Sequence, residues 1–268
     1  MLSIISHDWA KNLNLTPPKT KTTFYIDKIP SSIDSNNIYI QVEPESIIRV
    51  KDYLIQNWRN FKYIITFNQE ILDKCPNAKE YNYGTVWITQ PEYSTININS
   101  KQFRISTIVG NKFVTEGHIL RQGLLTNEKS FPTIEFFVSN NNLNIKRLFG
   151  KKKQLVGPSK FKTFQYFQYQ VVIENSRQTN YFTEKLMDCL ITKTIPIYWG
   201  CPNISKFFDT TGWIIFDNLS DLKAKLTLLT PEYYSSYESV INSNFQKCFD
   251  YIKIDDNINK TLLLLEDY

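Results

Sequence analysis

The chain has 268 residues, of which 42% are hydrophobic and 15% aromatic, so it can bury one large core or two cores of modest size. This composition argues against an intrinsically disordered chain. Lysine and arginine total 31 against 26 acidic residues, and a net charge of +5 is too small to require nucleic acid as a partner, although it suits an anionic small substrate.

The N-terminal residues 1–10 begin apolar but lack a basic region and a cleavage site, and Asp8 interrupts the run before it reaches signal-peptide length. No later stretch approaches the roughly 18 uninterrupted apolar residues that a transmembrane helix needs. The four cysteines are widely scattered and only two histidines are present, which disfavours a zinc site. We therefore expect a soluble, cytoplasmic chain with free thiols.

Short β-branched or aromatic runs alternate with helix-like stretches along the chain, which is typical of α/β layers with largely parallel sheets. In the first half, strands are predicted over residues 23–26, 37–42 and 63–67. Between the last two, residues 46–58 carry apolar side chains at helical spacing. These elements form a predicted βαβ unit.

The stretch 90–102 is polar and rich in serine, threonine and asparagine, with Pro91 inside it. Such a composition is typical of a connection between domains. We therefore predict an N-terminal domain over residues 1–100 and a C-terminal domain over residues 101–268.

The alternation continues beyond this boundary. Strands are predicted over residues 103–109, 133–138, 169–173, 194–199 and 213–216. Helices are predicted over residues 116–125, 183–193, 203–208, 221–229, 231–252 and 257–265. The lysine run at 151–153 suits either a phosphate-binding loop or a solvated loop, and we expect the solvated loop.

Residues 172–186 read VIENSRQTNYFTEKL, which is the end of a buried strand, a polar loop and re-entry into a helix at Thr183. Ligands bind outside the carboxyl ends of the strands in open α/β sheets. Thr183 suits the N-cap position, and the free amides and dipole of the helix favour an anion such as a diphosphate. Lys185 adds a positive charge, and Glu184 offers an acceptor for ribose hydroxyls.

Each of these residues also has an ordinary structural explanation. A glutamate in a first helical turn favours the dipole, a lysine on a helix is usually solvated, and Tyr181 is equally suited to covering the core. Their joint spacing favours a binding site over these separate explanations.

The motif resembles the donor motif of the α1,3-fucosyltransferases, which reads approximately as an apolar strand, Glu-Asn-Ser, several residues and Tyr-x-Thr-Glu-Lys. Its two parts stand here at residues 172–176 and 181–185. The next stretch, IPIYWGCPN at 195–203, is similar to the segment after the motif in bacterial and viral-type members. The resemblance is specific across about residues 169–216 and weak elsewhere.

The resemblance implies a GT-B fold, with two Rossmann-like domains facing a cleft, GDP-fucose in the C-terminal domain, inversion at the anomeric carbon, and no metal or cofactor. In that family the donor nucleotide is contacted at the positions matching Asn175, Tyr181, Glu184 and Lys185. The stretch 119–124 similarly resembles a short helix whose arginine, here Arg121, reaches the donor diphosphate. A surface ion pair is the alternative for Arg121.

An inverting transfer needs a base to take the proton of the attacking hydroxyl. The strand ending at Val42 is followed by the sequence EPE, which resembles the segment where these fucosyltransferases carry their catalytic carboxylate. Glu43 is the first choice because it directly follows the strand, and Glu45 is the reserve. Both are alternatively surface carboxylates, and Glu92 and Glu116 are weaker candidates.

Departure of a nucleoside diphosphate leaves negative charge that needs preorganised stabilisation. The Asp-x-Asp motif of metal-dependent transferases does not occur in the sequence. The available positive groups are Lys185, Arg121 and the helix N-terminus. His118 lies on the same helix face as Arg121, and we expect it to cap or line the site without chemistry.

These features predict an inverting, metal-independent glycosyltransferase that transfers L-fucose from GDP-fucose to a hydroxyl of a glycan or glycoconjugate acceptor. A phosphate-binding helix does not determine the sugar, so a transferase for another nucleotide sugar is the first alternative. The second is a non-catalytic module that binds carbohydrate or nucleotide.

Overall fold

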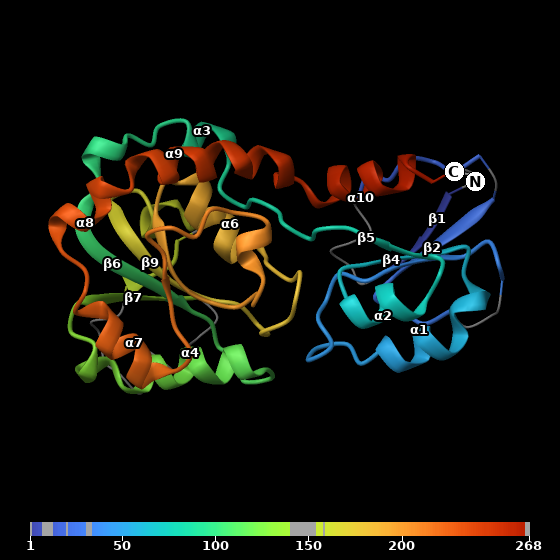
Figure 1. The fold of residues 1–268 in the computed structure, drawn as a ribbon, viewed down its shortest axis with the longest axis horizontal. Helices are drawn as coiled ribbons and strands as arrows, with labels where there is room; N and C mark the ends of the chain where they lie inside the picture. The colour runs from blue at the N-terminus through green and yellow to red at the C-terminus, as the bar shows by residue number, and fades with distance from the viewer. Residues whose placement is uncertain are drawn as a thin grey trace. The chain divides into compact units, whose positions relative to one another are not determined.

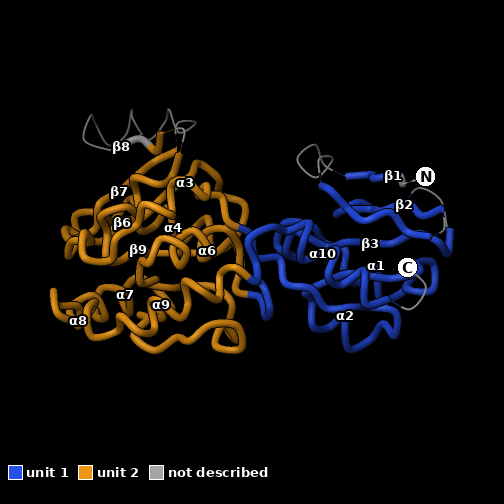
Figure 2. The backbone as a smooth tube through the Cα atoms, turned by 90° about the horizontal axis from the view of Figure 1, so that it is seen from above, with its two compact units in different colours: residues 1–85, 178–181, 250–268 blue, residues 86–177, 182–249 orange. Residues whose placement is uncertain are grey.

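The computed structural model describes residues 2–6, 13–19, 21–30, 34–139, 154–157 and 159–265. The chain forms two compact units, each with its own parallel sheet (Figure 1). The first unit comprises residues 1–85, 178–181 and 250–268, and the second comprises residues 86–177 and 182–249 (Figure 2). The lysine run at 151–153 lies outside the described residues.

The sheet of the first unit has five parallel strands, and neighbours in sequence are neighbours in space. The strands are β1 (Leu2–Ile5), β2 (Thr22–Ile26), β3 (Ile38–Ile40), β4 (Tyr63–Thr66) and β5 (Ala78–Glu80). The helices of this unit are α1 (Lys51–Asn57), α2 (Gln69–Lys74) and α10 (Ile254–Leu263).

Both faces of the first sheet are buried. Side chains alternate between the two faces along a strand, so a strand such as β3 contributes to the core on each face. Ile38 and Ile40 belong to one apolar cluster, which includes Ile258 of α10. Tyr39 points the other way and belongs to a second cluster, which includes Leu54 of α1. This double burial accounts for the continuous apolar character of the strand.

The sheet of the second unit has six parallel strands in the order β11-β10-β9-β6-β7-β8. The strands are β6 (Gln102–Val109), β7 (Ile134–Val138), β8 (Gln154–Leu155), β9 (Phe167–Ile173), β10 (Ile195–Trp199) and β11 (Ile214–Ile215). The chain builds the sheet outward from β6 to β8 and then continues on the other side of β6 with β9. The strand order therefore reverses between β6 and β9.

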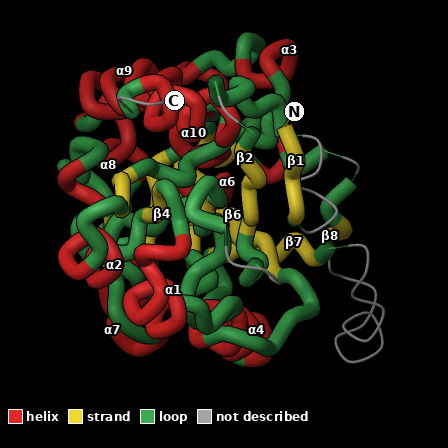
Figure 3. Tube along the Cα trace, turned by 90° about the vertical axis from the view of Figure 1, so that its right-hand side faces the viewer, coloured by secondary structure: helices red, strands yellow, loops and turns green. Residues whose placement is uncertain are grey.

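The second unit also contains α-helices, which Figure 3 distinguishes from the strands and loops. They are α3 (Gln90–Tyr93), α4 (Glu116–Thr126), α6 (Glu184–Ile191), α7 (Leu219–Leu226), α8 (Pro231–Ser236) and α9 (Glu238–Lys247). Within the described part of the chain, no helix combines the length and the apolar character needed to cross a membrane.

The α/β class with parallel sheets is confirmed, and the strands and helices around the motif lie within a few residues of their predicted bounds. The helix predicted over 46–58 is shorter, because residues 45–47 form a turn before α1. The helix predicted over 231–252 is divided into α8, α9 and a short 3₁₀ segment. The segment predicted as helix over 203–208 is a single 3₁₀ turn.

The chain passes from one unit to the other after Thr85 rather than at residue 100. The Asp188 carboxylate of α6 accepts hydrogen bonds from the backbone amides of Trp87 and Ile88, at 2.7 and 3.1 Å, and so ties this stretch to the second unit. The polar residues around Pro91 form the capped helix α3, not a linker.

Candidate functional site

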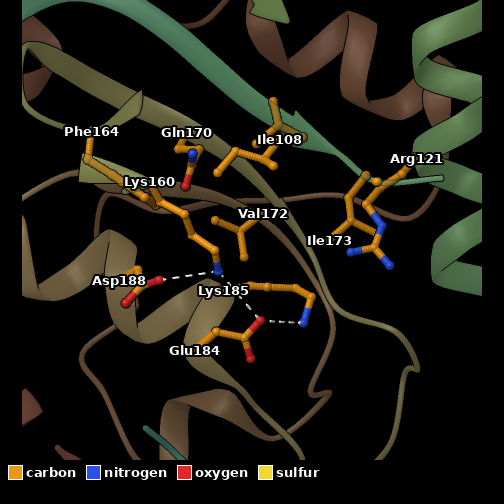
Figure 4. A pocket seen from close by; sticks show the side chains of 12 residues that line it. Ile108, Arg121, Lys160, Phe164, Gln170, Val172, Ile173, Glu184, Lys185 and Asp188 are labelled. Carbon is orange, nitrogen blue, oxygen red and sulfur yellow. Dashed lines mark hydrogen bonds and ion pairs between the residues drawn. The ribbon is translucent and has the colours of Figure 1, made fainter. Parts of the chain in front are cut away.

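The main candidate site is a cavity of about 100 Å³ in the second unit (Figure 4). Its lining residues are Ile108, Gly110, Arg121, Lys160, Phe164, Gln170, Val171, Val172, Ile173, Glu184, Lys185 and Asp188. The cavity thus includes the carboxyl ends of β6 and β9, where the strand order reverses. Open α/β sheets bind ligands at this topological position.

The loop after β9 is tied to the start of α6 by a buried carboxylate. Glu174 is fully buried and accepts hydrogen bonds from the Thr183 amide at 2.9 Å and the Thr183 hydroxyl at 2.7 Å. The Thr183 hydroxyl also accepts from the Lys185 amide at 3.3 Å, which confirms Thr183 as the N-cap. The first turn of the helix is therefore fixed at the cavity.

Two lysines and two carboxylates form a charged cluster in the cavity (Figure 4). Lys185 Nζ lies 3.0 Å from Glu184 Oε1, and Lys160 Nζ lies 3.7 Å from the same oxygen and 3.5 Å from Asp188 Oδ2. Burial alone raises the pKa of Glu184, but the charges of Lys185 and Lys160 outweigh it and lower that pKa to about 2. Glu184 is therefore an ionised acceptor at neutral pH.

Arg121 reaches the cavity from α4, and its Nη2 donates to Asn175 Oδ1 at 2.7 Å. The helix can approach this loop because residue 117 is glycine. A Cβ at Gly117 would lie 1.8 Å from the carbonyl oxygen of Glu174, whereas the Gly117 amide donates to the Asn175 carbonyl at 3.2 Å. The sequence thus brings two predicted site residues, Arg121 and Asn175, into direct contact.

His118 has the capping role expected of it. Its Nδ1 lies 2.7 Å from the Thr115 hydroxyl, and the Thr115 hydroxyl accepts from the His118 amide at 3.3 Å. Burial, together with the positive charge of Arg121, lowers the pKa of His118 to about 4. His118 is therefore neutral at pH 7 and is held in the first turn of α4.

Tyr181 does not line this cavity. It belongs to the apolar core of the first unit, where its ring centroid lies 5.2 Å from that of Phe67 and 6.5 Å from that of Tyr83. The preceding residue, Asn180, has a left-handed backbone with φ of 63°, and its side-chain amide donates to the Phe67 carbonyl at 3.3 Å. The structure therefore gives Tyr181 the core role, and its contact with a donor stays a prediction.

The two carboxylates predicted as bases follow β3 in the first unit. Glu43 is partly exposed, and its backbone amide donates to Asp27 Oδ2 at 3.0 Å. Glu45 Oε1 accepts from the Lys51 amide at 2.9 Å, in the first turn of α1, and burial raises its pKa. Glu45 thus already has a structural task.

The weaker base candidates are also engaged. Glu92 accepts from the amide and the hydroxyl of Thr89, both at 2.8 Å, and so caps α3. Glu116 accepts from the Arg177 amide at 2.9 Å. Neither contact singles out a residue prepared to remove a proton.

Sequence reasoning missed three polar residues of the cavity: Lys160, Gln170 and Asp188. Gln170 offered a signal, because it is a glutamine within the apolar strand β9, and it is only 3% exposed. Among the described residues, its side-chain nitrogen has no hydrogen-bond partner. Lys160 and Asp188 gave no local signal, because only the fold brings them together.

Comparison with known proteins matches residues 134–242 to the family described as Glycosyltransferase family 10 (fucosyltransferase) C-term. The α-(1,3)-fucosyltransferase FucT of Helicobacter pylori is 30% identical over 87 residues. That region is 32% of this chain and only 13% of the curated relative.

Solved structures share the fold over most of the chain. A crystal structure of an α1,3-fucosyltransferase with GDP-fucose has a TM-score of 0.57 at 14% identity and covers 94% of this chain and 92% of its own. A crystal structure of S. aureus TarM, in complex with UDP among other ligands, has a TM-score of 0.56 at 14% identity, covering 90% and 55%. At these identities the likeness shows a fold, that of the GT-B glycosyltransferases.

Proposed function

We propose that this chain belongs to glycosyltransferase family 10, whose C-terminal model matches residues 134–242, and that it transfers a sugar from a nucleotide diphosphate donor to a hydroxyl acceptor. The donor we propose is GDP-fucose, because the matched family is described as that of fucosyltransferases and one solved structure of similar fold contains GDP-fucose. The acceptor we propose is a glycan hydroxyl.

The observation that carries this proposal is the cavity at the strand-order reversal, where positive groups from two helices line one space. Arg121 comes from α4, Lys185 comes from the first turn of α6, and the amides of that turn add partial positive charge. A leaving diphosphate develops negative charge that such groups stabilise. We assign Arg121 and Lys185 to the diphosphate, with Asn175 orienting Arg121.

The carboxylate and amide groups of the cavity suit the nucleoside part of the donor. Glu184 is ionised and can accept from ribose hydroxyls. The Gln170 amide nitrogen, buried and without a partner among the described residues, favours an acceptor atom such as a nucleobase carbonyl. Lys185 exchanges its contact with Glu184 for a phosphate when the donor binds.

In the reaction we propose, the acceptor oxygen attacks the anomeric carbon, and the bond from that carbon to the phosphate oxygen breaks. The nucleoside diphosphate leaves with the electron pair, and Glu43 takes the proton of the acceptor hydroxyl. Glu45 is less suited because it holds the start of α1. The positive side chains, rather than a metal ion, are proposed to neutralise the leaving group.

We keep the cytoplasm as the proposed location, because Cys75, Cys189, Cys201 and Cys248 are all buried free thiols, as is usual in a reducing compartment.

The test is a donor screen by titration calorimetry in EDTA, with GDP-fucose, GDP-mannose, GDP, UDP and UDP-sugars, followed by a transfer assay over a broad panel of glycan acceptors. We expect GDP and GDP-fucose to bind and fucose to be transferred. Preferred binding of UDP or of another GDP-sugar would replace the donor, and a need for metal would overturn the metal-independent step. Binding without turnover on any acceptor would identify a binding module.

A further inference from the structure

A buried aspartate holds the backbone that carries Glu43. Asp27 directly follows β2 and is 5% exposed. Its Oδ1 accepts from the Val42 amide at 2.8 Å, and its Oδ2 accepts from the Glu43 amide at 3.0 Å. One carboxylate therefore fixes two successive peptide groups at the end of β3.

The backbone of Asp27 is in the left-handed region, with φ of 54°. This conformation is uncommon outside glycine and tends to persist at sites whose surroundings determine it closely. The Asp27 amide still donates to the Ile40 carbonyl at 3.1 Å, so the sheet pairing extends to this residue. The turn then directs the carboxylate across the end of β3.

A second set of buried groups makes hydrogen bonds with other polar atoms of residues 41–43. Gln41 Nε2 donates to the Glu43 carbonyl at 3.3 Å, and the Thr66 hydroxyl donates to Gln41 Oε1 at 2.5 Å. The Tyr81 hydroxyl donates to the Gln41 carbonyl at 2.5 Å. Side chains from three neighbouring segments of the sheet thus fix residues 41–43.

Burying polar side chains costs free energy unless each is hydrogen-bonded, and a network whose members are paired holds its parts in one geometry. The backbone held here is the one that carries Glu43. We propose that Asp27 is the positioning residue of the general base, which orients Glu43 by holding the amides of Val42 and Glu43. This inference rests on the proposed role of Glu43 in the transfer reaction.

The ionisation of Asp27 makes the contact sensitive to pH. Burial raises the pKa of Asp27 to about 7, helped by the charge of Glu43 and opposed by the hydrogen bonds from the amides of Val42 and Glu43. The neighbouring phenols of Tyr39 and Tyr81 stay protonated, because burial raises both of their pKa values further. Only ionised Asp27 offers both oxygens as full acceptors to the two amides.

The test compares Asp27→Asn with Asp34→Asn. Asparagine keeps the size of Asp27 but has one acceptor oxygen instead of two, whereas Asp34 is exposed and its carboxylate accepts from the Asn36 amide in its own turn. We expect Asp27→Asn to lower kcat about 10- to 100-fold, since small displacements of a catalytic group are this costly. Donor KM and GDP affinity should stay within about twofold of the parent, as both should in Asp34→Asn.

The pH profile separates positioning from a merely structural role. In the parent, kcat should rise as pH passes through about 7, and this step should be absent in Asp27→Asn. If Asp27→Asn does not fold, Thr66→Val provides the test, because it removes the hydroxyl that orients Gln41, together with the contact of that hydroxyl with the Asn68 amide at 2.9 Å. We expect Thr66→Val to lose several-fold in kcat at unchanged GDP affinity.

Amide NMR of the parent tests the contact without any activity. The signals of Val42 and Glu43 should titrate together at about pH 7. Full kcat in Asp27→Asn, unchanged kcat in Thr66→Val, or amide signals that do not titrate would overturn the positioning role. A parent that transfers no sugar would overturn the proposed function, and the amide titration would then decide the Asp27 contact separately.

Discussion

The carboxyl ends of the two parallel sheets carry their polar groups in different ways. At residues 41–43 of the first unit, buried side chains of fixed geometry hold the backbone. In the cavity of the second unit, Lys185 and Lys160 pair with carboxylates around empty volume, and the Gln170 nitrogen has no partner among the described residues. The first arrangement suits a group that must not move, whereas the second suits a ligand that replaces existing partners.

The largest effect expected from this comparison concerns Glu43. Glu43→Gln keeps the side-chain size but cannot accept the acceptor's proton, so transfer should slow about 10²- to 10⁴-fold while GDP affinity is retained. Turnover and calorimetry on the same preparation measure both. Glu45→Gln should be milder, and the opposite ranking would move the base to Glu45. If both variants are active, Glu92 and Glu116 become the candidates.

The next effect concerns the positive groups of the cavity. Lys185→Ala and Arg121→Ala should each weaken donor binding by about 1.5–3 kcal/mol, which is typical of a charge-assisted hydrogen bond to phosphate. Lys223→Ala is the control, since Lys223 is an exposed lysine of the same unit. If both cavity variants bind the donor as tightly as the parent does, residues 172–186 connect β9 to α6 without binding the donor.

A smaller effect is expected at the contact that brings α4 to the cavity. In Gly117→Ala the new methyl group would meet the Glu174 carbonyl, so the helix must shift, at a cost of about 1–3 kcal/mol in stability and with weaker donor binding through Arg121. Gly123→Ala in the same helix is the control, because its Cβ meets Leu219 at an ordinary 3.4 Å. Denaturant unfolding and calorimetry measure the two variants, and equal stability would contradict the close approach.

The most gradual effect, spread over several pH units, concerns the pH dependence of stability. The pKa of Asp27 is raised from 3.8 to about 7 in the folded chain, so the folded state keeps a proton that the unfolded state releases. The stabilisation that the Asp27 proton gives the folded state is therefore complete below about pH 4. It is lost as pH rises through about 7, and the free energy of unfolding falls by at most about 1.4 kcal/mol per pH unit. Asp27→Asn should remove this slope in denaturant unfolding series, and an unchanged slope would refute it.

Local chemistry made part of the site predictable. Thr183 was identified as an N-cap from its hydroxyl and the helix after it, and the apolar runs of β9 and β10 defined their strands. Lys160 and Asp188 were missed because their contact spans distant segments. Asp27 gives no local signal in the sequence beyond its place after the strand predicted over 23–26, because its contacts are with β3 and the residues after it, which come later in the sequence.

The same limit applies to the domain boundary and to Tyr181. The polar stretch around Pro91 suggested a linker because serine, threonine and asparagine favour both loops and helix caps. Tyr181 belongs to the motif by sequence and to the core of the first unit by packing. Periodicity reports only on neighbouring residues, so it cannot assign a short segment to a distant sheet.

The composition of the first unit has a consequence for synthesis on the ribosome. Its sheet is encoded within the first 85 residues, but one face packs against Tyr181 and against Ile258 and Leu262 of α10, which are translated much later. At about 5–20 residues per second, this apolar face waits on the order of ten seconds for its covering helix. The nascent chain therefore passes through a stage in which the first sheet is complete but uncovered, and in which chaperones have an exposed apolar face to bind.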